Sequence, residues 1–138
     1  MKKRNQSGFT LLEIIIVIII IGVLASLALP RLFSTVEFSR STEALAAIAT
    51  IRSSLERCYL QNNGSYSTCV LPVLDIEDPA TSPNSHFAYS IQSLTRPGYT
   101  IVATRTTADG GSATSTITVV QTSVGVTKSG TDAFKTIK

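Results

Sequence analysis

The chain has 138 residues, of which 43% are hydrophobic and 15% charged, a composition that suits one folded domain together with a membrane element. Its formal net charge of +3 equals the contribution of Lys2, Lys3 and Arg4, because the other nine of the 12 basic side chains balance nine acidic ones. The rest of the chain is neutral overall, so its charge makes no case for nucleic acid as the partner.

A segment from Phe9 to Leu29, uncharged except for Glu13, is long enough to cross a bilayer. Its 21 residues would rise about 31 Å as a helix, the thickness of the hydrocarbon core. The basic residues before it predict a cytoplasmic N-terminus, with the chain from Arg31 onward across the membrane. A secretory signal peptide is one alternative, although its core is usually only about 7–15 residues long and carries no acid. A plain membrane anchor is the other, and it gives no reason for Glu13.

The residues that open this segment form a recognisable pattern. Gly8-Phe9-Thr10-Leu11-Leu12-Glu13 follows the basic leader, and Gly22 and Pro30 come further along. The pattern resembles the N-terminal segment of type IV pilins and of type II secretion pseudopilins. This resemblance implies that a membrane-embedded prepilin peptidase removes residues 1–8, cleaving after Gly8, and methylates the new amino group of Phe9. It also implies a homo-oligomeric helical filament, built by a membrane platform protein on which an assembly ATPase acts.

Glu13 is the expected assembly residue, together with Phe9. Cleavage would leave a cationic amine on Phe9, four residues before Glu13. Opposite charges attract far more strongly in a low-dielectric groove than in water. Pairing within one chain is open, because the two groups are one helical turn apart. The resemblance favours pairing between Glu13 and the amine of a neighbouring subunit.

Gly22 and Pro30 mark a weak region of the predicted helix. Proline removes a helical hydrogen bond and clashes with the preceding turn, and glycine lowers helix propensity. We expect a continuous helix through residues 9–30 that is kinked between Gly22 and Pro30, since membrane helices tolerate such kinks. The alternative is a helix that ends at Leu29 and a second one that starts at Pro30.

Residues 31–60 show the spacing of an amphipathic helix. Apolar side chains separated by four, three, four and three positions fall on one face: Ala44, Ile48, Ile51, Leu55 and Cys58. Gly64, at the end of a Gln-Asn-Asn-Gly sequence, predicts that this helix ends near residue 60. The connection 61–86 contains Asp75, Glu77 and Asp78, and we expect it to be a structured loop with solvated acids.

The C-terminal half is predicted to form a sheet. Its β-branched and aromatic runs are Phe87–Gln92, Tyr99–Arg105, Ser115–Gln121 and a weaker Val124–Thr127. Short connections, including the turn signal Asp109-Gly110-Gly111, require antiparallel order. The expected fold is α+β and pilin-like: a long bent N-terminal α-helix, its first half transmembrane, on an antiparallel sheet of three to four strands. The globular domain would be 31–138, with the sheet at 87–127 and a tail at 128–138.

The two cysteines, Cys58 and Cys69, both lie on the predicted oxidising side of the membrane. A disulfide would close a loop with ten intervening residues and contribute about 2–3 kcal/mol in the chain-entropy model. Two buried free thiols are the alternative. A metal site is less favoured, because His86, the one histidine, lies 17 residues past Cys69 and no ligand spacing recurs. Many pilins carry their bridge nearer the C-terminus, so this placement departs from the resemblance.

No pattern of catalytic residues or phosphate-binding glycines is present, so we expect neither an enzyme nor a cofactor. A calcium site in the acidic loop is disfavoured, because the acids lack the spacing of a calcium-binding loop. The resemblance instead implies a structural subunit of a type IV pilus-like filament, held in the bacterial inner membrane as a precursor and then exported in an extracellular pilus.

Two alternatives to that function stay open. One is a pseudopilin of a type II secretion system, which would work in a periplasmic pseudopilus. The other is a DNA-uptake pilin, although nucleic acid is an unlikely partner by charge. The candidate basic residues for it are few: Lys128, Lys135 and Lys138.

Overall fold

The structure is a computed structural model that describes residues 8–138. The basic residues of the expected leader, Lys2, Lys3 and Arg4, lie outside the described residues. The chain divides into two compact units, residues 1–35 and residues 36–138.

One helix, α1 (Leu11–Gln61), passes through both units and has Pro30 in its interior. It therefore does not end at Leu29, whereas the bend expected near Pro30 stays a prediction. In the first unit the large apolar side chains between Phe9 and Leu29 are 40–79% exposed. By length and composition this helix could cross a membrane. Its apolar surface is free to contact lipid or other helices.

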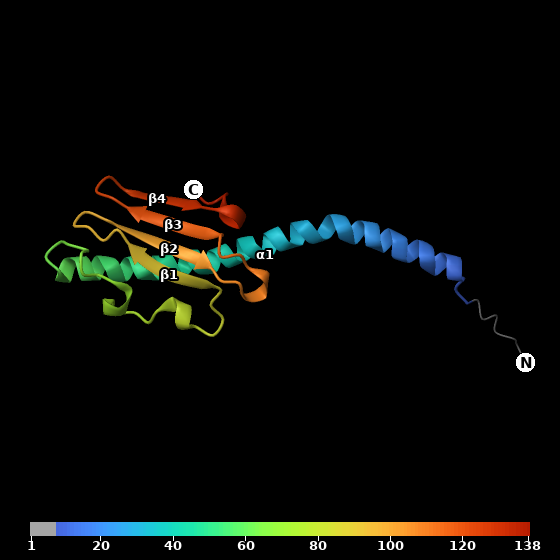
Figure 1. Cartoon of the computed structure of the whole chain (residues 1–138), viewed down its shortest axis with the longest axis horizontal. Helices are drawn as coiled ribbons and strands as arrows, with labels where there is room; N and C mark the ends of the chain where they lie inside the picture. The colour runs from blue at the N-terminus through green and yellow to red at the C-terminus, as the bar shows by residue number, and fades with distance from the viewer. Residues whose placement is uncertain (1–7) are drawn as a thin grey trace, which may run out of the picture. The chain divides into compact units, whose positions relative to one another are not determined.

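The second unit contains a four-stranded antiparallel sheet in the order β1-β2-β3-β4 (Figure 1). Its strands are β1 (Phe87–Gln92), β2 (Tyr99–Arg105), β3 (Thr116–Gln121) and β4 (Val126–Gly130). Alternation in β2 turns every second side chain, from Tyr99 to Arg105, toward the core. The sheet packs on the part of α1 that belongs to the same unit.

The predicted fold class is confirmed, and β1 and β2 begin and end at the expected residues. The fourth strand was misplaced: β4 begins at Val126 and ends at Gly130, inside the expected tail. The reason is the hairpin turn, in which the Thr122 N–H donates to the Gly125 carbonyl oxygen at 2.9 Å. That turn contains Val124, so pairing with β3 starts only after Gly125.

The core lies between the inward face of the sheet and one stripe of α1. On the helical side, four of the five side chains that the spacing predicted are buried, with Ala44, Ile51 and Leu55 at 0% exposure, whereas Cys58 is half-buried. Ile101, Ala103, Ile117 and Val119 contribute the opposite side. At the C-terminal end of the chain, Phe134 closes the core against Phe87, with ring centroids 5.7 Å apart. Burial of these apolar side chains fixes the sheet against the helix.

Candidate functional site

The processing residues Gly8 and Phe9 precede α1 and are exposed. A side chain added at Gly8 would meet nothing within 4 Å. The fold therefore gives no steric reason for glycine at this position, which leaves recognition by another protein as a reason. Phe9 is 79% exposed, so its ring is equally unused by the fold.

Glu13 lies in the first turn of α1, where its backbone N–H donates to the Thr10 hydroxyl oxygen at 3.2 Å. This contact satisfies one of the free N–H groups at the helix start. The Glu13 carboxylate forms no ion pair with any residue of 8–138. It is the one ionisable side chain between residues 9 and 30. Glu13 is thus a carboxylate in an apolar segment, and no cationic side chain among residues 8–138 pairs with it.

Gly22 and Pro30, the expected kink residues, both lie inside α1. A side chain at Gly22 would meet nothing within 4 Å. Pro30 lacks the N–H that would donate to the carbonyl oxygen of Ser26, four residues earlier. Both residue types lower helix stability in general, and the kink expected between Gly22 and Pro30 stays a prediction.

The predicted disulfide between Cys58 and Cys69 is confirmed, with Cα atoms 6.0 Å apart. It joins the last turns of α1 to the connection that follows. Beside it, Tyr66 packs edge-on against Tyr99 with ring centroids 4.9 Å apart. The Tyr66 hydroxyl donates to Glu56. Burial and the nearby Glu56 carboxylate raise the pKa of Tyr66 well above its usual value.

A buried arginine, Arg105, joins the sheet to the helix. It is 0% exposed, and its guanidinium donates to both carboxylate oxygens of Glu37 on α1, at 3.1 and 3.3 Å. Its Nη1 also donates to the carbonyl oxygens of His86 and Thr106, at 3.2 and 3.0 Å. A side chain at Gly111 would overlap this guanidinium, so the close approach requires glycine there. The buried charge is thus compensated on all sides, as buried ions require.

His86 extends this cluster of charges toward the β2–β3 connection. Its Nδ1 lies 2.9 Å from Glu43 Oε2, and its Nε2 lies 3.1 Å from Asp109 Oδ2. Arg40 on α1 also contacts Asp109, at 3.5 Å. The His86 ring therefore lies between a carboxylate of α1 and one of the β2–β3 connection. No sequence motif indicates this network, and the available signal is Arg105 itself, a charge at an inward position of a strand.

Asp75 in the acidic connection is exposed, as expected, but its carboxylate also has partners that the sequence did not indicate. Its carboxylate accepts hydrogen bonds from Arg57, at 2.6 and 2.7 Å, and from the buried Ser54 hydroxyl. These bonds, that from Arg57 first, hold the pKa of Asp75 well below its usual range. Glu77 and Asp78 behave differently and line a cavity instead.

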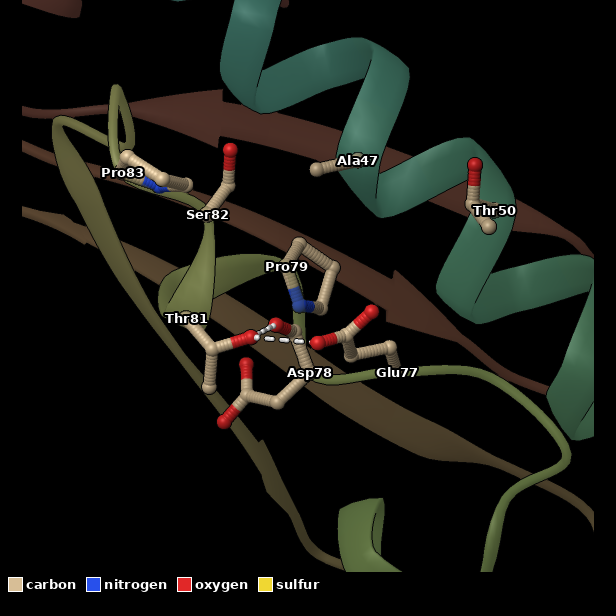
Figure 2. Close-up of a pocket in the computed structure, with 8 residues that line it drawn as sticks. All are labelled: Ala47, Thr50, Glu77, Asp78, Pro79, Thr81, Ser82 and Pro83. Atoms are coloured by element: carbon tan, nitrogen blue, oxygen red, sulfur yellow. Dashed lines mark hydrogen bonds between the residues drawn. The ribbon is translucent and has the colours of Figure 1, made fainter.

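That cavity, of about 450 Å³, lies between α1 and the connection (Figure 2). Ala47 and Thr50 project from α1, while Pro79 and Ser82 face them from the connection. A second cavity of about 410 Å³ shares Ala47, Pro79 and Ser82 and reaches Glu43 and His86, so the two form one groove. Within residues 8–138 no three His, Cys, Asp or Glu side chains are placed to hold a metal ion.

These features define a class of protein: a pilin-like subunit with an exposed apolar helix and a disulfide-closed α+β domain. Residues 3–29 match the family described as "Prokaryotic N-terminal methylation motif". Residues 30–118 match "Type IV minor pilin ComP, DNA uptake sequence receptor". Because this second match spans well over half of the chain, the chain belongs to that family, and the resemblance to type IV pilins and pseudopilins is confirmed.

Curated relatives carry the name "Type II secretion system core protein G". The relative from Aeromonas hydrophila is 44% identical over 63 residues, which are 46% of this chain and 44% of the relative. The one from Pseudomonas aeruginosa is 40% identical over 68 residues, 49% of this chain and 48% of the relative. The chain thus spans about half the length of these relatives. No solved structure matches the chain.

The N-terminal match is to a methylation motif, and the match over residues 30–118 is to a family of type IV minor pilins. The family is one of structural proteins. The apolar part of α1 is in keeping with anchoring in a membrane before assembly.

Proposed function

We propose that the chain is a structural subunit of a pilus-like filament and that it works as a pseudopilin of a type II secretion system. The observation that carries the filament proposal is the exposed apolar surface of residues 9–29, in the same chain as a disulfide-closed domain. Such a surface needs lipid before assembly and packed helices afterwards. The relatives named core protein G support the secretion system over the extracellular pilus that the sequence first favoured.

Processing follows the N-terminal pattern. In this proposal a prepilin peptidase cleaves after Gly8 and methylates the amine of Phe9, and the unpaired Glu13 then binds the amine of a neighbouring subunit. A match to the methylation motif over residues 3–29 supports the cleavage, and the unpaired carboxylate supports the pairing. Assembly energy would come from an ATPase that acts through a membrane platform protein.

Mass measurement tests the processing. The full chain, expressed with its cognate peptidase and extracted from membranes, should have a methylated Phe9 at its N-terminus. Gly8→Glu should leave the leader in place, because a large charged side chain would block the cleavage position, while Gly8→Ala is the milder control. Recovery of the Gly8→Glu chain with an N-terminus at Phe9 would contradict the assignment.

Deletion of the coding sequence tests whether the chain forms a filament and whether that filament belongs to a secretion system or to an extracellular pilus. Loss of exoproteins from the medium, restored by the full chain, would support the pseudopilin. Loss of sheared surface filaments with secretion intact would support the extracellular pilus. If both secretion and filaments survive the deletion, the chain is not an essential subunit of either assembly and the proposal fails.

A second candidate, a DNA-receptor pilin, is favoured by the family match over residues 30–118. Arg52 and Lys128 line one small groove and would be its phosphate contacts. Retention of duplex DNA that weakens as salt rises, and weakens further in Lys128→Glu, would support this candidate. The absence of any retention at low salt would remove it.

A further inference from the structure

Two grooves of opposite charge lie beside α1 in the second unit. The first, which we call the acidic groove, lies between α1 and residues 77–86 and contains Glu77 and Asp78 (Figure 2). The second, the basic groove, lies between α1 and the β3–β4 hairpin and contains Arg52 and Lys128. Both fall at the same level of the helix.

The grooves face different directions because of helix geometry. Ala47 lines the acidic groove and Ala49 the basic one. Two helical residues that are two positions apart point about 200° apart around the axis. The order of the strands supports the same conclusion, because β1 and β4 are the two edges of the sheet. Tyr89 of β1 lines the acidic groove, and Lys128 of β4 lines the basic groove.

The charges in both grooves are left without ionic partners. Among residues 8–138, no ion pair includes Glu77 or Asp78, and none includes Arg52 or Lys128. Asp78 accepts one backbone hydrogen bond, from Ala80 at 2.9 Å, through one of its two oxygens. Arg52 donates through Nε to the Tyr99 hydroxyl at 3.4 Å, which leaves its two terminal amino groups available.

A lysine on an edge strand has a simpler explanation, which is to discourage strand pairing with other chains. That explanation accounts for Lys128 but not for Arg52 beside it, nor for two unpaired acids on the other side of the same helix. Charge complementarity between the two sides accounts for all four residues.

We propose that the acidic groove of one subunit binds the basic groove of a second copy of this chain, with Lys128 reaching the carboxylates of Glu77 and Asp78. This contact rests on the proposed function, because it names the neighbour that packs beside each domain in the filament. Since the two surfaces are different, the contact is heterologous and can repeat without closing, as a filament requires. Exposed charges of this kind select the partner and its orientation more than they add affinity.

Zero-length carbodiimide cross-linking tests the contact in assembled material. The reagent joins a lysine amine to a carboxylate that touches it, with loss of water. Two full-length chains are co-expressed with the assembly machinery: Lys128→Arg, which keeps its charge but cannot couple, and Glu77→Gln. An amide between Lys128 and Glu77 can then form only between different copies. We expect mass spectrometry to find this amide in the assembled fraction.

Charge reversal provides the second measurement, with Arg96 as the matched control because it is exposed and lies in neither groove. Arg52→Glu retains Lys128 and should lower the yield of the amide about tenfold or more, since like charges would then face each other. Arg96→Glu should leave the yield unchanged. The double variant Glu77→Lys/Lys128→Glu should restore a cross-link between the two exchanged positions. Formation of the Cys58–Cys69 bridge, read as a mass shift on reduction, shows that each variant is folded.

The outcomes separate the contact from the proposed function. An assembled fraction that lacks the Lys128–Glu77 amide overturns the contact and leaves the filament subunit intact. A wild-type chain that never enters an assembled fraction overturns both. If duplex DNA protects Lys128 from acylation while the amide is absent, the basic groove is a phosphate site and the contact between copies is wrong.

Discussion

Glu37→Met should destabilise the globular domain more than any other exchange of a partly exposed acid, because it leaves Arg105 as a buried cation without its carboxylate. Glu37 accepts from Arg105 Nε and Nη2, and the Arg105 side chain is 0% exposed whereas that of Glu37 is 22% exposed. Methionine keeps most of the packing volume of Glu37 and removes its carboxylate, which also contacts Arg40 Nη1 at 3.4 Å.

The expected loss follows from the partners that remain. Removal of one member of a buried ion pair costs about 3–5 kcal/mol. Arg105 still has the carbonyl oxygens of His86 and Thr106, and its guanidinium lies 5.9 Å from the Phe87 ring centroid. We therefore expect a loss in the free energy of unfolding at the lower end of this range, about 3 kcal/mol. For a domain of this size, such a loss lowers the melting temperature by about 12 °C.

Near-ultraviolet circular dichroism of the full chain in detergent micelles can measure this loss. The chain has four tyrosines and no tryptophan, and all four tyrosines lie in the second unit, so the signal reports on the domain alone: Tyr59, Tyr66, Tyr89 and Tyr99. Glu77→Met, at an exposed acid outside any described ion pair, is the control.

The double variant Glu37→Met/Arg105→Met separates a buried charge from lost packing. Because both charges are gone, it should melt above Glu37→Met alone. If Glu37→Met has the same melting temperature as the Glu77→Met control, the Arg105–Glu37 pair does not hold the sheet to the helix. The same conclusion follows if the melting temperature of the double variant is lower than that of Glu37→Met.

Three further predictions concern other parts of the chain. Replacing both Cys58 and Cys69 by alanine should lower the free energy of unfolding by about 2–3 kcal/mol, seen as a lower denaturant midpoint; an unchanged midpoint would contradict it. The pKa of Asp75 is lowered by Arg57, so its stabilisation is present above its unfolded pKa and lost as pH falls below about 4. The melting temperature of Asp75→Asn should therefore fall less than that of the wild type as the pH is lowered. An equal fall in both proteins would refute the pairing of Asp75 with Arg57. Glu13→Ala should be cleaved and methylated yet enter filaments poorly beside wild-type subunits, a result that normal incorporation by immunoblot would overturn.

Local patterns were enough to predict the fold. Runs of β-branched and aromatic residues located β1 and β2 to the residue, and helical spacing indicated the buried stripe of α1. The end of α1 at Gln61 also follows from local chemistry, because Gly64 adopts φ 74° and its N–H donates to the Tyr59 carbonyl oxygen at 3.0 Å. The error at β4 arose where a turn and a strand compete for the same short stretch.

Long-range pairs of charges could not be predicted in the same way. Glu37 and Arg105 are 68 positions apart, and Glu43 and His86 are 43 apart, so no spacing rule connects them. Asp75 is exposed as a loop acid is expected to be, but its partner Arg57 lies 18 positions away on α1, and no spacing rule connects the two. Inward-facing polar residues in otherwise apolar alternation, such as Arg105, were the one sequence signal that such a network exists.

The two units would contribute differently to the selection of a neighbouring subunit in the proposed filament. In the proposed filament, residues 9–29 would move from lipid into packed helices. Lipid tails are as apolar as leucine, so this transfer would provide little hydrophobic driving force and little selectivity. Selectivity must then come from polar groups that a wrong neighbour would leave unpaired. In the first unit Glu13 is the one such group within residues 9–30, and it can fix the position of a neighbour along the helix. It cannot fix which side of a domain the neighbour occupies, so that choice requires a second set of charges on the domain, and the acidic and basic grooves are the surfaces suited to it.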